Sequence, residues 1–584
     1  MNPMGGIPIQ TNSLEGAQRK CLLGILSLGL LLNVWGVTWG LPERWHPDEL
    51  TQRAENMVGE PSLNPHYFAY GGLHYYLIAA FAVLPVKIPN KMLNVMDYDA
   101  QSTVVVALSR LLSALLGTGV VYLTFWIGSR LFDRWTGLLA SAFLATSMVL
   151  VNLSHFATAD VPSVFWFMLS CAMATDVLRR GAARSYVLAG LCAGLAAAVK
   201  YVGGLSLIAL FAAHLLGKRA SHKMLVVAFV MAAAGFILGN PVLLFAPLEF
   251  ADGFVAESVF NSLRGFGLPR AFVPLIFQLK DALGAPVFLL SLAGLAYGVR
   301  LSASKENRAS VLLVLSMMLP YYCVIGAMRG PRAGPLLLPL PPLRYTLPML
   351  PFLLLFPAKM LGDLLVSPRR HVRGFSLTLL GVSICYSIVY AVSVDLKFTN
   401  DSRYAAGDWL LRNLRAGATI ETTSYGPTIP HDKYVVVERP HNSQVADVAA
   451  FVSQSGRYLR FQTMIAKLEV WVERAGLRSR SEDYVPWYRK ALLRYDQETS
   501  TFDSTIQGLE SRAPDVLVAS DLYFVRFQDG SSADGRFFRD LLSGKSSYKR
   551  VATFHYELPS WTDPPAEFVN PTIYVYSQGP SDRE

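Results

Sequence analysis

Residues 21–49 read CLLGILSLGLLLNVWGVTWGLPERWHPDE, a long uncharged run that ends in a cluster of ionisable residues. The uncharged part, Cys21–Pro42, is long enough to cross a bilayer as a helix. It is too long for the apolar core of a signal peptide and lacks a small-residue cleavage site. We therefore expect an uncleaved first transmembrane helix, followed at the membrane surface by His46–Glu49.

The composition of the whole chain agrees with a membrane protein. Of its 584 residues, 52% are apolar and only 16% are charged, whereas about a quarter of the residues in a soluble domain are charged. This balance excludes a disordered, fibrous or ordinary cytosolic protein. The five cysteines all lie in apolar stretches, which indicates buried hydrophobic residues instead of disulfides or zinc ligands.

Further apolar runs in the first 394 residues predict a total of eleven membrane spans. These spans begin near Cys21, Val106, Trp135, Pro162, Tyr186, Tyr201, Met224, Ala285, Ser310, Tyr345 and Phe375. A shorter run, Tyr70–Pro85, contains two glycines and a histidine. Counting it as a span would place most basic loops outside, against the positive-inside bias. We therefore predict an interfacial or re-entrant helix there.

The net charge of +10 belongs to the apolar half of the chain. Residues 1–394 hold 29 basic and 17 acidic residues, and the remainder is close to neutral. Basic loops facing an anionic leaflet explain this distribution, whereas no nucleic-acid-binding motif is present. We expect a multi-pass membrane protein with a cytoplasmic N-terminus and no nucleic-acid partner.

The sequence predicts a polytopic α-helical membrane protein with two domains. Residues 1–394 form the transmembrane domain, whose outer loop 43–105 carries interfacial helices. Residues 395–584 lose the long apolar runs and are expected to form a soluble extracytoplasmic α/β domain.

Local patterns predict several elements outside the spans. Arg403–Leu414 has helical spacing, and Asp515–Ala519 and Thr572–Tyr576 are typical of short strands. The segment Gly330–Pro342 is rich in proline and is expected to be a non-helical outer loop.

Acidic residues are predicted at two places on the outer face. Pro47 is expected to begin a helix with Asp48 and Glu49 in its first turn, where the helix dipole favours anions. Asp160 lies in the turn before the fourth span, where it suits an N-cap. Helix capping explains each position separately. Two carboxylate sites at one membrane face also suit general-base chemistry.

Histidines accompany both acidic sites. His46 precedes the first pair of acids, and His155 lies five residues before Asp160. Imidazole and carboxylate groups also serve divalent-metal chemistry, so that His46, Glu49 and Asp160 form an alternative metal-ligand set. A divalent metal cation is thus left open as a cofactor.

Basic residues are expected at the same face. Lys200 lies at the junction of two spans, Arg344 begins a span, and Arg110 lies near the outer end of the second span. Each alone is typical of an interfacial anchor. Three cations beside an acidic cleft also suit a phosphate group.

At these residues the sequence resembles the protein O-mannosyltransferase-like C-type glycosyltransferases (glycosyltransferase family 39), to which the bacterial aminoarabinose–lipid A transferase is related. The resemblance rests on motifs whose order covers the membrane half and both ends of the tail. They are HPDE at His46–Glu49, NPHYFAYGGLHYYL at Asn64–Leu77, SRLLSALLGTG at Ser109–Gly119, HFATADVP at His155–Pro162, VKYVGG at Val199–Gly204, GNP at Gly239–Pro241, RYTLPMLPFL at Arg344–Leu353, DSRYAAGDWLLRNL at Asp401–Leu414 and NPTIYVY at Asn570–Tyr576.

The resemblance implies a C-type glycosyltransferase fold of about eleven transmembrane helices. It also implies transfer of a sugar from a polyprenyl-phosphate-linked donor to an acceptor on the extracytoplasmic face. The acceptor would be a protein, a lipid glycan or a cell-wall polymer. Asp48 matches the general base of the family, and Asp160 matches its second acid. The stretch that carries a lysine in the lipid A relative corresponds to Ala69–Gly72, which contains none.

We accordingly predict a set of catalytic and substrate-binding residues at the outer membrane face. The catalytic residues are Asp48, Glu49 and Asp160, and the substrate-binding residues are Lys200, Tyr201, Arg344, Tyr345, His155 and Tyr70. Asp48 would deprotonate the acceptor, while Lys200 and Arg344 would stabilise the departing lipid phosphate within the surrounding membrane lipid.

Two other classes of protein are weighed against the enzyme. A transporter or flippase of lipid-linked sugars would carry ionisable residues in the middle of several spans, and only Arg110 approaches this pattern. A membrane-anchored sensor would leave the outer acids unexplained. The sequence favours the enzyme, with the transporter second.

Overall fold

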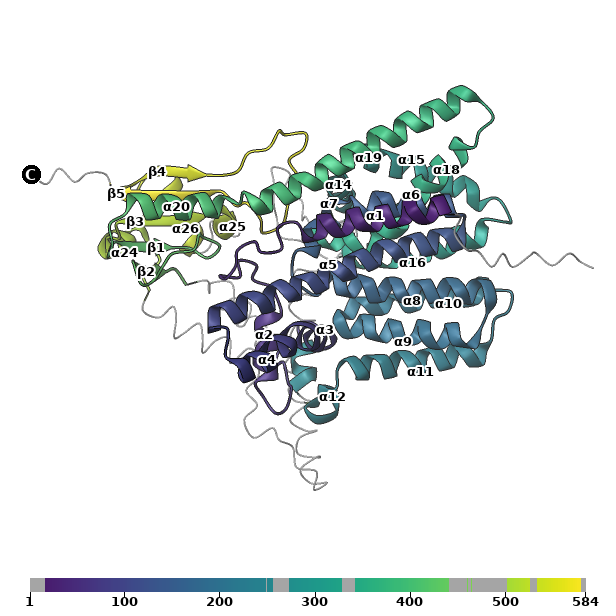
Figure 1. Ribbon diagram of the computed structural model, residues 1–584, viewed down its shortest axis with the longest axis horizontal. Coiled ribbons are helices and arrows are strands. Elements are labelled where there is room, and N and C mark those ends of the chain that lie inside the picture. Colours follow the sequence, from purple (N-terminus) through teal and green to yellow (C-terminus); the bar gives the residue numbers. More distant parts are fainter. Residues whose placement is uncertain are drawn as a thin grey trace, which may run out of the picture.

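Long apolar helices form a bundle, and a small sheet domain extends from one end of it (Figure 1). The computed structural model describes residues 16–247, 249–255, 272–327, 342–440, 460, 464, 502–525 and 533–578. The predicted loop 330–342 therefore lies, except for Pro342, outside the described residues. The bundle helices are α1 (Gly16–Val34), α5 (Tyr98–Leu131), α6 (Arg134–Ala145), α7 (Met148–Ser154), α8 (Asp160–Arg180), α9 (Ala183–Val199), η2 (Tyr201–Leu205), α10 (Ser206–Leu216), α11 (His222–Gly239), α14 (Phe272–Leu283), α15 (Ala285–Ser302), α16 (Arg308–Ala327), η3 (Leu343–Met349), α17 (Leu350–Leu353), α18 (Leu355–Leu365) and α19 (Arg370–Thr399).

Each predicted span coincides with one of these helical segments. Among the described residues, nine helices are long and apolar enough to cross a membrane, or ten if the bent pair α6–α7 is one span. Two predicted spans, α9 and η2–α10, are apolar helices shorter than these nine. One of the nine helices, residues 73–93, belongs to a segment that we predicted to lie at the membrane interface. The predicted class, a polytopic helical membrane protein with a small α/β region near its C-terminus, is confirmed.

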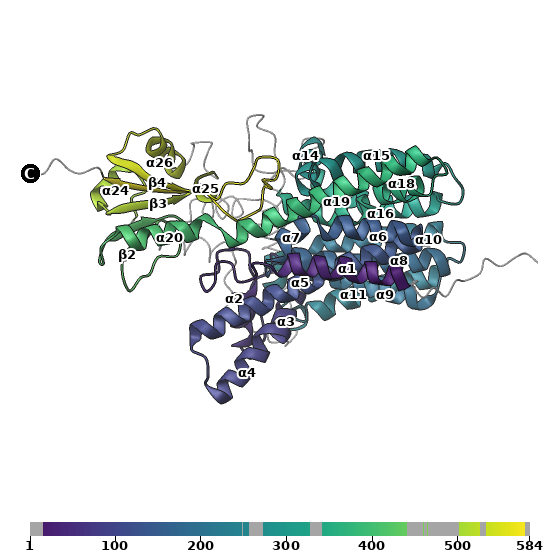
Figure 2. The ribbon, with the colours of Figure 1, turned by 45° about the horizontal axis from the view of Figure 1, so that its top comes forward.

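Shorter helices lie at the end of the bundle that carries the sheet domain. They are α2 (Thr51–Val58), α3 (Leu73–Ile78), η1 (Ala79–Val83), α4 (Leu84–Leu93) and α12 (Val242–Phe245). Figure 2 shows α3 and α4 leaving the bundle at an angle to α1 and α8. The loop before them touches the end of α9, because Gly71 N donates to Val199 O at 3.1 Å. The interfacial position of this segment stays a prediction, because residues 73–93 are also long and apolar enough to form a span.

The packing of α9 against α11 depends on small residues. Gly190 and Gly194 lie one turn apart on α9 and face Ala228 and Ala232 of α11. A Cβ added at Gly194 would lie 2.0 Å from the Ala232 carbonyl oxygen, and one at Gly190 would lie 2.0 Å from that of Ala228. Small residues at this spacing let the backbones of membrane helices approach closely.

The N-terminus of α1 and the sheet domain lie at opposite ends of the bundle (Figure 1). The turns α10–α11 and α18–α19 lie at the N-terminal end in the same view. These turns carry Lys218, Arg219, Arg369 and Arg370. Basic loops that are far apart in the sequence therefore gather at one end of the bundle, as the loop charges predict.

The C-terminal domain contains a mixed five-stranded sheet of order β2-β1-β3-β5-β4. Its strands are β1 (Thr419–Thr422), β2 (Val435–Glu438), β3 (Val516–Ser520), β4 (Tyr548–Phe554) and β5 (Ile573–Gln578). β1 pairs in parallel with β2 and β3, and β5 pairs antiparallel with β3 and β4. β3 and β5 confirm the two predicted strands. The other described elements are α20 (Ser402–Asn413), α24 (Ile506–Arg512), α25 (Asp521–Phe524) and α26 (Ala533–Leu542).

Both faces of the sheet are covered by helices. α20, the predicted helix, packs Ala406 and Leu410 against Val518 on one face. On the other face, Phe538 of α26 packs near Leu517. Alternate residues of β3 thus face helices on opposite sides of the sheet, and all five residues of β3 are buried. Burial on both faces explains why β3 appears in the sequence as a continuous apolar run.

We expect Gly194→Ala to destabilise the protein, because the new methyl group would collide with backbone atoms of α11. Gly381→Ala is the matched control, since Gly381 is an exposed residue of α19 with no atom within 4 Å of the added Cβ. At such a position alanine favours a helix by about 0.5–1 kcal/mol over glycine. The thermal midpoint in detergent should therefore fall for Gly194→Ala and stay level or rise for Gly381→Ala. Equal shifts in both variants would contradict this account of the packing.

Candidate active site

Four carboxylates and three cations gather at the end of the bundle that faces the sheet domain. The carboxylates are Asp48, Glu49, Asp160 and Glu567, and the cations are Arg110, Lys200 and Arg344. They come from the loop after α1, from α5, α8 and η3, from the α9–η2 junction, and from the connection between β4 and β5. The bundle thus brings together the catalytic acids and the cations that the sequence analysis predicted.

Asp48 forms an ion pair with Arg344. Its Oδ2 accepts from Arg344 Nη1 at 2.8 Å, and its side chain is 33% exposed. Burial alone would raise the pKa of Asp48, but the Arg344 guanidinium and the neighbouring His46 together outweigh burial and the pKa is lowered. Asp48 is therefore a carboxylate that is both ionised and partly accessible, in direct contact with a cation.

His46 supports Asp48 from the main-chain side. The Asp48 N–H donates to His46 Nδ1 at 3.1 Å, and the imidazole packs between the rings of Phe156 and Phe568 at centroid distances of 4.2 and 4.4 Å. Burial lowers the pKa of His46 to about 4. The ring is therefore neutral near pH 7 and serves as an acceptor for the loop that carries Asp48.

Glu49 is bound on all sides by protein groups. It accepts from Arg110 Nε at 2.7 Å and from Arg110 Nη2 at 3.0 Å, and the Ala157 N–H donates to it at 3.0 Å. Burial would raise the pKa of Glu49, but Arg110 reverses that shift and the pKa is lowered. The pair with Arg110 fixes the loop that carries Asp48, and the catalytic role of Glu49 stays a prediction.

The prediction that a helix begins at Pro47 is wrong. Helix α2 begins at Thr51, and its N-cap Leu50 makes no side-chain capping hydrogen bond. Asp48 and Glu49 precede this helix, because their carboxylates bind Arg344 and Arg110, residues of distant helices. The capping interpretation of these two acids therefore fails.

Asp160 and Lys200 form a second ion pair beside the first. Lys200 Nζ donates to Asp160 Oδ1 at 2.7 Å, and Thr158 Oγ1 donates to Asp160 Oδ2 at 3.2 Å. The ammonium lies over the rings of Tyr345 and Tyr70, 5.1 and 5.9 Å from their centroids. Asp160 is the first residue of α8 and its N-cap is Ala159, so its carboxylate serves the ion pair. Four predicted residues thus converge here.

Two further residues that were predicted to bind substrate, Tyr201 and His155, contact main-chain carbonyl groups of the protein, and their substrate-binding role stays a prediction. Tyr201 donates from its hydroxyl to Phe68 O at 2.7 Å and so fastens the outer loop. The ring nitrogens of His155 lie 2.7 Å from Val151 O and 2.5 Å from Trp35 O, and the ring stacks on Phe398. Only 1% of the His155 surface is exposed, so this side chain is buried in the protein core.

Two residues at the site were missed by the sequence analysis. Glu567 accepts from the backbone N–H of Arg344 at 2.9 Å, and Phe568 packs on His46. Both precede the motif Asn570–Tyr576 by a few residues. The resemblance of this motif to the family is the sequence feature that could have pointed to Glu567 and Phe568, because neither residue follows a recognisable pattern of its own.

The alternative metal-ligand set gains no support from the described residues, among which no group of three His, Cys, Asp or Glu side chains is arranged to hold a metal ion. Of the three residues in that set, Glu49 binds Arg110, Asp160 binds Lys200, and His46 accepts from the Asp48 main chain.

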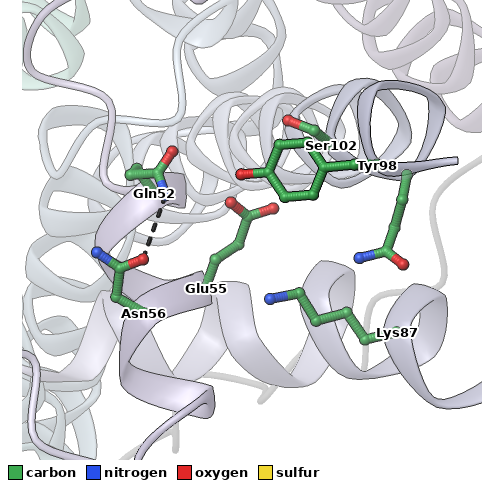
Figure 3. Close-up of a pocket in the computed structure, with 7 residues that line it drawn as sticks. Gln52, Glu55, Asn56, Lys87, Tyr98 and Ser102 are labelled. Carbon is green, nitrogen blue, oxygen red and sulfur yellow. Dashed lines mark hydrogen bonds between the residues drawn. The ribbon is translucent and has the colours of Figure 1, made fainter. Parts of the chain in front are cut away.

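A separate polar cavity of about 190 Å³ lies between α2, α4 and α5 (Figure 3). It is lined by Gln52, Glu55, Asn56, Lys87, Tyr98, Gln101 and Ser102. Arg44 closes one side of this region, where it donates to Gln52 at 2.6 Å and to Glu55 at 3.0 Å. None of the predicted site residues lines this cavity, so it is distinct from the cluster around Asp48.

Comparisons with known proteins agree with the motif-based resemblance. Residues 37–250 match the family model described as dolichyl-phosphate-mannose-protein mannosyltransferase. This segment contains His46–Glu49, Asp160 and Lys200. The sequence matches no curated protein.

Similar solved structures include membrane glycosyltransferases. The Archaeoglobus fulgidus oligosaccharyltransferase in its apo form is 12% identical, with 94% of this chain and 75% of that chain covered and a TM-score of 0.50. ArnT from Cupriavidus metallidurans in the apo state is 10% identical, with 96% and 98% covered and a TM-score of 0.47. The first likeness shows a shared fold. Residues 37–250 are thus similar to the dolichyl-phosphate-mannose-protein mannosyltransferase family, within a chain whose fold is similar to that of the archaeal oligosaccharyltransferase.

Proposed function

We propose that the protein transfers a sugar from a polyprenyl-phosphate-linked donor to an acceptor on the extracytoplasmic face of a bacterial or archaeal plasma membrane. The acceptor is a protein, a lipid glycan or a cell-wall polymer. The observation that carries this proposal is the contact of 2.8 Å between Asp48 and Arg344, since it places a carboxylate base beside a cation suited to phosphate. The family of residues 37–250 supports the same reaction.

In the proposed mechanism, Asp48 accepts the proton of the acceptor nucleophile, commonly a hydroxyl. The freed electron pair attacks the anomeric carbon, the bond from that carbon to the phosphate oxygen breaks, and the polyprenyl phosphate leaves with those electrons. Arg344 and Lys200 stabilise the negative charge on the leaving phosphate. Positioned bases of this kind contribute about 10²–10⁴-fold to rate.

The ion pair also couples donor binding to the strength of the base. In the unliganded site, Arg344 holds the pKa of Asp48 down against the effect of burial. A donor phosphate that draws the guanidinium toward itself weakens this interaction, and Asp48 becomes more basic. The base would therefore be strengthened when the donor is in place.

The transporter alternative is weakened by the position of Arg110. This residue was the main charged group expected inside a span. Its guanidinium is fully buried, binds Glu49 and donates to Val37 O and Trp39 O. Arg110 thus fixes the outer loop, and the charged cluster lies at one end of the bundle, where a transferase needs it.

We propose that the bundle end with the sheet domain is extracytoplasmic. A reporter fused after Arg219 should then be cytoplasmic, and one fused after Glu584 should be exterior, because the basic turns favour the cytoplasmic side. Compartment-specific enzyme fusions in a bacterial host measure this. If both reporters were on one side, the proposed topology would be wrong.

Asp48→Asn should lower turnover by about two orders of magnitude or more, because the amide cannot accept the proton. Folding should be little affected, since Asn is similar in size and Arg344 retains Glu567 as an acidic neighbour. The matched control is Glu43→Gln, which neutralises an exposed acid of the same loop. Transfer is measured with purified protein in nanodiscs and a panel of radiolabelled polyprenyl-phosphate sugars, followed by product identification. Near-normal transfer by Asp48→Asn would refute the assignment of Asp48 as base.

The pH dependence of kcat/KM should be flat from about pH 8 to about pH 5 and should fall only near and below about pH 4. The reason is that burial keeps the pKa of His46 at about 4 and Arg344 keeps the pKa of Asp48 below its usual value. Asp48 is active when ionised, so activity is lost as the pH falls through its lowered pKa. An inflection near pH 6.5 that vanishes in His46→Asn would instead assign the titrating group to His46.

A further inference from the structure

The C-terminal domain reaches into the candidate active site through one short segment. This segment belongs to the connection between β4 and β5, which runs from residue 555 to residue 572. At its tip, Glu567 Oε1 accepts from the backbone N–H of Arg344 at 2.9 Å, and Glu567 Oε2 lies 4.0 Å from Arg344 Nε. The Glu567 N–H donates to Asn152 Oδ1 of α7 at 3.3 Å.

The hydrogen bond from the Arg344 N–H to Glu567 satisfies a main-chain donor at the start of a helix. Arg344 is the second residue of η3, whose N-cap Pro342 makes no side-chain capping hydrogen bond. The first N–H groups of a helix have no partners within the helix, and its N-terminus favours a negative charge. Glu567 supplies an acceptor for one of these N–H groups. The main chain that carries the Arg344 guanidinium is therefore anchored by another domain.

The segment is itself held firmly by the start of α20 within the C-terminal domain. Phe568 O accepts from Arg403 Nη2 at 2.9 Å, and the Asn570 N–H donates to Asp401 Oδ2 at 2.6 Å. Phe568 and Asn570 have φ values of +63° and +53°, in a region that costs energy for residues other than glycine. Such a conformation persists only where surrounding contacts fix it. Glu567 is thus presented to Arg344 by a rigid support.

We propose that Glu567 is a positioning residue that holds Arg344 in place for the phosphate of the lipid-linked donor. The C-terminal domain then completes the active site instead of standing beside it. This inference rests on the proposed function, because it takes the donor phosphate as the ligand of Arg344.

The segment that contains Glu567 and Phe568 supports both members of the Asp48–Arg344 pair. Glu567 fixes the Arg344 main chain, and the neighbouring Phe568 packs on His46, which accepts from the Asp48 N–H. A shift of this segment would consequently move the base and the cation relative to each other. The hydrogen bond to a main-chain N–H needs an acceptor oxygen at the correct length, which glutamine also provides.

Variants at this position separate length from charge. Glu567→Gln keeps the length and the acceptor oxygen, Glu567→Asp keeps the charge but is one methylene shorter, and Glu567→Ala removes both. Glu557→Ala is the matched control, because Glu557 is an exposed acid of the same connection. Each full-length variant is placed in nanodiscs, its thermal midpoint is recorded, and its affinity for undecaprenyl phosphate is measured.

We expect Glu567→Ala and Glu567→Asp to weaken binding of undecaprenyl phosphate about tenfold, the effect of losing the hydrogen bond to the Arg344 main chain. Glu567→Gln should stay within about threefold of the unmodified protein, and Glu557→Ala should match it. If Glu567→Ala fails to fold, the contrast between Asp and Gln carries the test. In the transfer assay, the loss should raise the KM for the donor more than it lowers kcat.

Three outcomes would overturn the inference. They are unchanged binding in Glu567→Ala, a loss in Glu567→Gln equal to that in Glu567→Ala, and full binding in Glu567→Asp. Failure of the proposed function has a different signature, since the unmodified protein itself would then not bind the lipid phosphate.

Discussion

The architecture of the outer end depends on the buried ion pair between Arg110 and Glu49. The two side chains are 0% and 4% exposed, and burying charges is costly unless each is fully paired and hydrogen-bonded. Arg110 meets this requirement with Glu49 and two carbonyls of the chain that leaves α1, while Glu49 also accepts from Ala157. One pair therefore joins α5, the loop after α1 and the turn before α8. The Arg110–Glu49 pair therefore fixes the segments that carry Asp48 and Asp160.

The remaining charges of the site are also paired, which shapes how it can bind a ligand. Arg344 contacts Asp48, and Lys200 contacts Asp160. An anionic phosphate has to compete with these carboxylates for the cations, so binding of the donor alters the environment of the base. Under the proposed function, these preformed ion pairs would link recognition of the lipid phosphate with activation of the acceptor.

Several kinds of contact join the C-terminal domain to the bundle. Trp39 Nε1 donates to Asp401 Oδ2 at 3.0 Å, and the Arg403 guanidinium lies 4.2 Å from the Trp45 ring centroid. Lys397 donates to Pro564 O at 2.6 Å. These contacts flank the segment with Glu567, so the domain and the loop after α1 support each other. The position of the C-terminal domain is consequently part of the geometry of the site.

The sequence alone determined the features that depend on local pattern. Apolar runs identified the bundle helices, other than α14, and the short strands β3 and β5, because each pattern reflects burial of a single element. The acids Asp48 and Asp160 and the cations Lys200 and Arg344 were found from charge at the ends of apolar runs. Only the tertiary structure decided which of them pair. Arg344 meets Asp48 across 296 positions and Glu567 across 223, and no local pattern encodes contacts that arise from the packing of distant helices and a second domain.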